Sequence, residues 1–205
     1  KTLKNGWNKE NIGSHIVRNN EIYNCEQAGI CGSMGAAFSI IEHNEVYNIF
    51  TKRQFWGDEM AGLKFHAATD IIVRNNCIHH CIRGFWYDWL AQGVRITGNL
   101  FYNNVWQDLY LEVNHGPFLI DNNIFLSDVN ITDISEGGAF VHNLFAGMTV
   151  LGAEKNRFTP YQLPHSTDIA GISTISSGDD RYFNNIFVGN GQQIKLNERN
   201  EYGLS

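Results

Sequence analysis

The sequence predicts an all-β solenoid, a right-handed parallel β-helix, from a repeated phrase and from strand-like alternation. The phrase is an apolar residue, then after two or three residues an Asn, any residue and another apolar residue. Its asparagines follow one another at intervals of 24, 32, 23, 24, 20 and 42 residues: Asn20, Asn44, Asn76, Asn99, Asn123, Asn143 and Asn185. A period near two dozen residues indicates stacked coils that bury one another's apolar faces.

We interpret each repeated Asn as a turn residue in an internal ladder, because its side chain can bond the backbone at a bend and the next Asn above. The residue two places later is always apolar and is expected to point into the core: Ile22, Val46, Ile78, Phe101, Phe125, Phe145 and Phe187. The segments RITGNLF and DLYLEV alternate as strands do. The asparagines are therefore expected to build the fold and not to do chemistry.

Composition narrows the function classes. A chain of 205 residues with 43% hydrophobic residues suits one β-helix domain, taken here as residues 1–205. The formal net charge is −6 and no run of Lys or Arg stands out, which disfavours nucleic acid and, more weakly, polyanionic polysaccharides. No stretch is apolar enough to suggest a membrane partner, while a homo-oligomer stays open.

The four cysteines, Cys25, Cys31, Cys77 and Cys81, form no CxxC pair and no zinc-like spacing with histidine. We therefore expect neither a metal site nor a cofactor. Unpaired thiols fit a reducing compartment, and no signal peptide is visible, so a cytoplasmic location is expected. Because the sequence begins with Lys1 and not Met, its true N-terminus is expected to lie upstream.

Two intervals are longer than the rest and predict loops, where sites on a rigid solenoid are usually built. The 32-residue interval adds about eight residues around Lys52 to Met60, and the 42-residue interval holds Leu151 to Asp180. Between them, GFWYD (Gly84 to Asp88) aligns with DLYLE in the next coil, which places Asp88 beside Glu112. GLKFH in the preceding coil puts His66 in the same outward column.

Adjacent strands lie about 4.8 Å apart, and retaining glycosidases need two carboxyl groups about 5 to 5.5 Å apart. A stacked Asp88 and Glu112 meets that requirement, and two close carboxylates split their pKa values into an acid and a base. The same pair is also compatible with surface charge or a calcium site. Aromatic and polar residues nearby are candidates for sugar binding: Trp86, Tyr110, Asn114, His115, Asp58 and Glu59.

The strings WYDWLAQG and LEVNHGP, with GDEMAGLKFH, resemble glycoside hydrolase family 120, the β-xylosidases, from about Trp56 to Asn190. The resemblance implies that Asp88 is the nucleophile, Glu112 the general acid/base and Glu59 a ligand of the sugar, with Asp58 a weaker candidate. It also implies retaining, exo-acting release of xylose from β-1,4-xylo-oligosaccharides. Members of that family are longer, so further coils and a β-sandwich domain are expected to be missing here.

Other classes also fit the predicted fold, which is pectate-lyase-like, because one fold hosts many functions. A polysaccharide lyase would need acidic calcium ligands and a basic residue in the groove, and Lys64 and Arg83 lie nearby without a basic cluster. A non-catalytic, carbohydrate-binding β-helix or stalk should have even coils. The two long interruptions argue against that last alternative.

Overall fold

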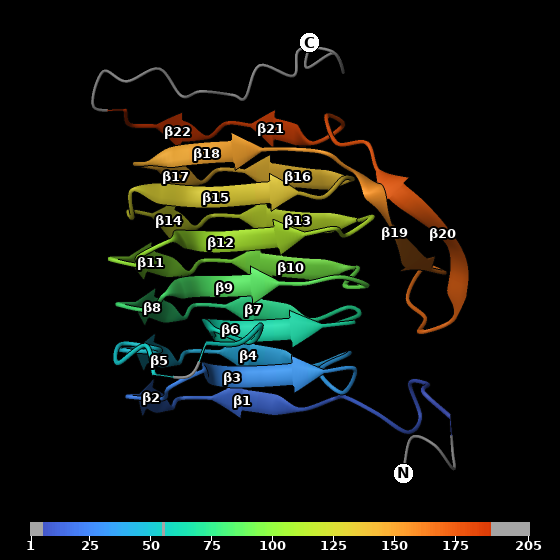
Figure 1. Cartoon of the computed structure of the whole chain (residues 1–205), viewed down its shortest axis with the longest axis horizontal. Helices are drawn as coiled ribbons and strands as arrows, with labels where there is room; N and C mark the ends of the chain where they lie inside the picture. The colour runs from blue at the N-terminus through green and yellow to red at the C-terminus, as the bar shows by residue number, and fades with distance from the viewer. Residues whose placement is uncertain (1–5, 55, 190–205) are drawn as a thin grey trace.

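The computed structural model describes residues 6–54 and 56–189, which form a stack of coils made of short strands (Figure 1). The remaining residues of the expected domain, 1–5, 55 and 190–205, lie outside the described residues. Strands of successive coils pair in parallel and build three sheets, so the predicted parallel β-helix is confirmed. No helix capable of crossing a membrane occurs in the described part of the chain.

The first sheet contains β1 (Ile16–Arg18), β4 (Ile40–Glu42), β7 (Ile72–Arg74), β10 (Val94–Thr97), β13 (Phe118–Asp121), β16 (Gly138–Val141) and β21 (Arg181–Phe183). The second contains β2 (Glu21–Tyr23), β5 (Glu45–Tyr47), β8 (Cys77–His79), β11 (Leu100–Tyr102), β14 (Ile124–Phe125), β17 (Leu144–Phe145) and β22 (Ile186–Phe187). The third contains β3 (Ala28–Ser33), β6 (Ala61–His66), β9 (Arg83–Tyr87), β12 (Gln107–Glu112), β15 (Val129–Ile134) and β18 (Met148–Leu151).

The repeated asparagines form the expected ladder at the corner between the first and second sheets. Asn99 shows the pattern: its Nδ2 donates to Asn123 Oδ1 (3.0 Å) and to the Val73 carbonyl (2.9 Å), while its Oδ1 accepts from the Asn76 backbone (2.9 Å). The same contacts run from Asn20 to Asn185. These bonds satisfy buried backbone groups that the bend would otherwise leave without partners.

The residue before each ladder Asn has a left-handed backbone, with φ between 51° and 65°: Asn19, His43, Asn75, Gly98, Asn122, His142 and Asn184. All seven are Asn, His or Gly, which tolerate that conformation best. This turn divides RITGNLF, whose alternation is typical of strands, into β10 and β11. Apolar and polar residues keep alternating through this corner, although the strand hydrogen bonding is interrupted between Thr97 and Leu100.

The core fills the space between the sheets, and the apolar residues two places after the ladder stack inside it. Phe101, Phe125 and Phe145 are buried, with ring centroids 5.1 and 5.3 Å apart. Val46 and Ile78 continue the stack below. At the ends the packing loosens: Ile22 is only partly buried and Phe187 is 42% exposed. The predicted inward column is therefore confirmed through its middle coils.

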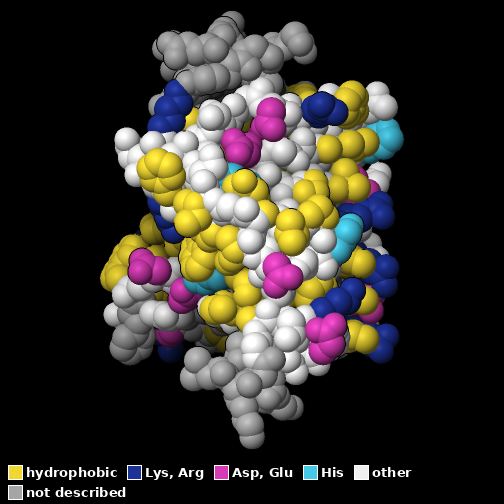
Figure 2. All heavy atoms as spheres, turned by 90° about the vertical axis from the view of Figure 1, so that its right-hand side faces the viewer, with side chains coloured by type: hydrophobic (Ala, Val, Ile, Leu, Met, Phe, Trp, Pro, Cys, Tyr) yellow, Lys and Arg dark blue, Asp and Glu magenta, His cyan; other side chains and the backbone are white. Residues whose placement is uncertain are grey.

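The longest interval forms an antiparallel hairpin, β19 (Glu154–Gln162) and β20 (Ile169–Ile175), that runs along one side of the stack (Figure 1). It leaves the upper coils, and its turn reaches the lower ones, where His165 Nδ1 lies 2.8 Å from Asp70 Oδ2 and Thr167 Oγ1 donates to the Trp7 carbonyl (2.6 Å). Hydrophobic side chains cover much of this side (Figure 2), including the exposed Phe158 and Ile172 of the hairpin.

The ladder is expected to carry a large share of the stability. Replacing Asn99 with alanine removes its amide contacts and leaves buried partners unsatisfied at about 1–3 kcal/mol each, so we expect a loss of about 3 kcal/mol in the free energy of unfolding. Denaturant unfolding measures it, with the exposed Asn156→Ala as control, which should change stability by less than about 0.5 kcal/mol. Equal losses in the two variants would contradict the ladder's role.

Candidate active site

The register of the third sheet brings Asp88 and Glu112 together. Strands β9 and β12 pair in parallel and align two pairs of fully buried side chains, Phe85 with Leu109 and Tyr87 with Leu111. The next residue of each coil is Asp88 and Glu112, on the alternate, outward side. The two carboxyl groups thus stand in neighbouring coils, whose strands are about 4.8 Å apart.

Asp88 lies in a cationic setting that makes it a stable carboxylate. It is 5% exposed, and its Oδ2 is bonded by Lys64 Nζ and by His66 Nε2, the latter at 2.8 Å. Its Oδ1 accepts from the Trp89 backbone N–H (2.6 Å). Burial by itself would raise the pKa of Asp88, but hydrogen bonds from His66 and Lys64, with the ammonium charge, outweigh it and lower the pKa to about 2.

The pKa of Glu112, in contrast, is raised. Burial raises its pKa first, and the negative charge of Asp88 raises it further. Two donors oppose the shift without cancelling it: Trp86 Nε1 donates to Oε2 and Arg157 Nη1 to Oε1, each at 2.8 Å. One carboxyl of the pair is therefore held ionised while its neighbour is biased toward the protonated form.

The aromatic residues beside the carboxylate pair, Trp86 and Tyr110, pack against charged side chains of the site. The Trp86 ring is 8% exposed, with Lys64 Nζ 3.4 Å and the Arg83 guanidinium 4.2 Å from its centroid. The Trp86 ring therefore packs against two cationic side chains and not against open space for a sugar. Its N–H orients Glu112. Tyr110 packs 5.5 Å from Trp86, and burial raises the pKa of Tyr110 to about 12, which keeps the phenol neutral.

The loop of the 32-residue interval reaches the site, as its position in the sequence predicted. Glu59 Oε2 lies 4.0 Å from Lys64 Nζ, and its Oε1 lies 3.8 Å from His66 Nε2. Its side chain is 37% exposed, so Glu59 contacts both solvent and the two residues that bond Asp88. Asp58, one residue earlier, is exposed.

Asn114 and His115 follow Glu112 in the sequence but face other partners. Asn114 is fully buried; its Nδ2 donates to the Tyr87 carbonyl and its Oδ1 accepts from the Ala91 backbone, each at 3.0 Å. His115 Nδ1 lies 2.9 Å from Glu136 Oε1, and its Nε2 contacts Thr159 in the hairpin. The hydrogen bonds of both side chains are directed away from the carboxylate pair.

Two residues at the site were not among the candidates taken from the sequence. The sequence indicates Lys64 only as a potential lyase base, whereas in the structure it is fully buried and ion-paired with Asp88. A lysine inside the apolar string AGLKFH was the available signal. Arg157 is 45 residues from Glu112 in the sequence and reaches it because the hairpin folds back. No local pattern indicated that contact.

The comparisons with known proteins agree with this architecture. A family model, "Right handed beta helix region", matches residues 8–203. No curated protein matches the sequence. A solved structure, "The complex structure of XylC with xylose", is 51% identical with a TM-score of 0.90, and the similarity covers 94% of this chain but 30% of the XylC chain. The stacked parallel coils and the match over nearly the whole sequence show that this chain belongs to the family of right-handed β-helix proteins.

Proposed function

We propose that the chain carries the active site of a retaining, exo-acting glycoside hydrolase that releases xylose from the non-reducing ends of β-1,4-xylo-oligosaccharides. The observation that carries this proposal is the pair of neighbouring carboxyl groups with opposite pKa shifts, Asp88 down and Glu112 up. The resemblance to glycoside hydrolase family 120 and the similarity to XylC, whose structure holds xylose, support the sugar class.

The proposed reaction has two displacements at the anomeric carbon. The Asp88 carboxylate attacks that carbon and forms a glycosyl ester, while Glu112 donates its proton to the departing glycosidic oxygen. Glu112, now a carboxylate, then removes a proton from water, and the resulting attack breaks the ester. The anomeric configuration is inverted twice and is therefore retained.

The neighbours have distinct roles in this scheme. Lys64 and His66 keep Asp88 ionised and hold its carboxylate in place. Trp86 orients Glu112, and the half-exposed Glu59 is positioned to accept hydrogen bonds from sugar hydroxyls. Tyr110, half-buried above Trp86, would line the same side of the substrate.

A lyase is the rival class, and Lys64 bears on it. Proton abstraction needs a base that can give up its own proton and reach the substrate. The Lys64 ammonium is fully buried and bonded to Asp88 and His66, so it is poorly placed as a free base. This arrangement favours the hydrolase over the lyase.

Removing the cation of Arg157 is expected to extend activity to higher pH. Activity requires protonated Glu112, so kcat/KM falls as pH rises through the pKa of Glu112. Arg157 opposes the raised pKa, and Arg157→Gln should therefore move the alkaline limb upward, with Arg157→Lys close to the parent. The pH profile of kcat/KM measures this. An alkaline limb that stays in place or moves to lower pH in Arg157→Gln would show that Arg157 does not lower the pKa of Glu112.

The test of the function is product analysis with the 205-residue chain. We expect hydrolysis of p-nitrophenyl β-xyloside, with β-xylose appearing before α-xylose in the proton NMR spectrum. Xylotriose labelled at its reducing end should give unlabelled xylose and labelled xylobiose first. Early α-xylose would exclude retention, and labelled xylose as the first product would exclude attack from the non-reducing end. An unsaturated product would favour the lyase, and sugar binding without any product would favour a binding module.

A further inference from the structure

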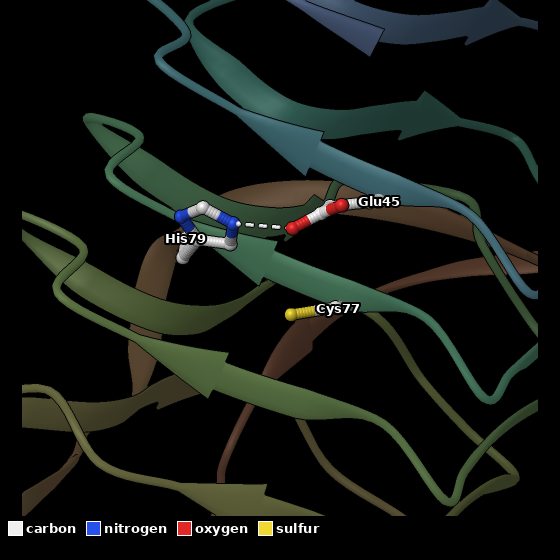
Figure 3. Close-up of side chains that lie close together, drawn as sticks. All are labelled: Glu45, Cys77 and His79. Atoms are coloured by element: carbon white, nitrogen blue, oxygen red, sulfur yellow. Dashed lines mark hydrogen bonds and ion pairs between the residues drawn. The ribbon is translucent and has the colours of Figure 1, made fainter. Parts of the chain in front are cut away.

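Three potential metal ligands meet on the outer face of the second sheet, away from the carboxylate pair in the third (Figure 3). Glu45 belongs to β5, and Cys77 and His79 belong to β8. The parallel register places Glu45 directly beside Cys77. Because side chains two apart in a strand share a face, His79 projects on the same side as Cys77.

The distances suit one ion. His79 Nε2 and Glu45 Oε1 are 3.2 Å apart, and they and Cys77 Sγ all lie within 4.8 Å of one another. Two ligand atoms at about 2.0–2.1 Å from zinc in a tetrahedral site are about 3.3 Å apart, and a thiolate sulfur lies slightly farther out. The 3.2 Å separation also suits a hydrogen bond, so the convergent thiol is what distinguishes this cluster from an ordinary His–Glu pair.

The surroundings fix the ligands before any ion binds. The His79 ring is stacked between Tyr47 and Tyr102, with centroids 5.0 and 4.5 Å away. Its Nδ1 faces His80 Nδ1 at 2.6 Å, which leaves Nε2 directed at Glu45. Tyr102 also hydrogen-bonds Cys77. Metal-binding histidines typically hold their second ring nitrogen in such a contact.

We propose that Glu45, Cys77 and His79 form a Zn²⁺ site with three protein ligands and a fourth position open to water. A mixed set of carboxylate, thiolate and imidazole suits zinc better than magnesium or calcium, which prefer oxygen alone. The ion would join β5 to β8 across the 32-residue interval, the coils that carry the long loop at Lys52 to Met60. CxxC-type spacing could not reveal it, because Glu45 comes from a different coil from Cys77 and His79.

A second Cys–Glu–His group in the same chain serves as an internal comparison. Cys31 Sγ lies 3.8 Å from Glu59 Oε2, and His66 lies 3.8 Å from Glu59 Oε1. Here, however, the Lys64 ammonium lies 4.0 Å from Glu59 and 3.3 Å from His66. Its positive charge disfavours a cation, so the two groups should differ in metal binding although they share residue types.

The test is titration of the full chain with Co²⁺, which replaces Zn²⁺ and gives a near-ultraviolet charge-transfer band when a thiolate binds it. We expect the band to saturate at one equivalent and to disappear when Zn²⁺ is added. Cys77→Ser should abolish it, and the exposed Glu45→Gln should weaken binding at least about tenfold. The matched control, Cys31→Ser, should keep the band unchanged.

Circular dichroism is used to check that each variant is folded. Glu45→Gln tests the site even where Cys77→Ser is destabilised, because Glu45 is exposed. Zn²⁺ should also raise the Tm of the parent and leave that of Glu45→Gln almost unchanged. No band in the parent, or a band lost in Cys31→Ser and kept in Cys77→Ser, would overturn the proposal.

Discussion

Asp88→Asn is expected to lower kcat for xyloside hydrolysis by roughly 10⁴- to 10⁶-fold, the range seen when a catalytic nucleophile is removed. An amide has nearly the shape of the carboxylate but cannot form the glycosyl ester. Initial rates on p-nitrophenyl β-xyloside measure the loss. The exposed Asp128→Asn, two coils further along the stack, is the matched control and should keep full activity.

A loss of activity in Asp88→Asn must be separated from a loss of fold. The change leaves the buried Lys64 ammonium without its partner, which typically costs about 3–5 kcal/mol. The double variant Asp88→Asn/Lys64→Met removes that charge and should recover stability without recovering activity. Azide added to Asp88→Gly should restore turnover and yield the α-xylosyl azide. Recovery of hydrolysis in the double variant would show that Asp88 acts through the structure and not as the nucleophile.

Glu112→Gln is expected to affect substrates according to their leaving groups. Hydrolysis of xylobiose expels xylose, a poor leaving group that needs the proton, so kcat/KM for xylobiose should fall by about 10²- to 10⁴-fold. Nitrophenolate leaves without much assistance, so kcat/KM for p-nitrophenyl β-xyloside should fall far less. Steady-state kinetics on both substrates measure the difference, with the exposed Glu10→Gln as control. Equal losses on both substrates would argue against Glu112 as the acid.

Features that follow the repeat were predictable from the sequence. The ladder asparagines and the column of His66, Asp88 and Glu112 depend only on which positions align from coil to coil, and the periodic apolar pattern fixes that alignment. The proximity of the two carboxyl groups explains only part of their opposite pKa shifts: the charge of Asp88 adds to the effect of burial on Glu112, whereas His66 and Lys64 lower the pKa of Asp88.

Features that break the repeat were not predictable. Strict alternation would place Asn114 on the same outward side as Glu112. Val113, however, has φ 49°, and the turn there directs Asn114 inward, where its backbone N–H donates to Ser135 Oγ. The Arg157 contact depends on the path of a hairpin whose strands pair with each other and not with the coils. No residue pattern along the sequence encodes such a path.

The hairpin also changes how the molecule should come apart. In a solenoid each coil touches only its neighbours, so terminal coils can open independently of the rest. Here Thr69 Oγ1 donates to Gln162 Oε1 (2.9 Å), and Thr167 Oγ1 donates to the Trp7 carbonyl, so the hairpin is bonded to coils far from it in the sequence. Fraying at the lower end must break contacts anchored in the upper coils. The hairpin thus couples coils that are not neighbours, and we expect the lower and upper coils to unfold together and not one at a time.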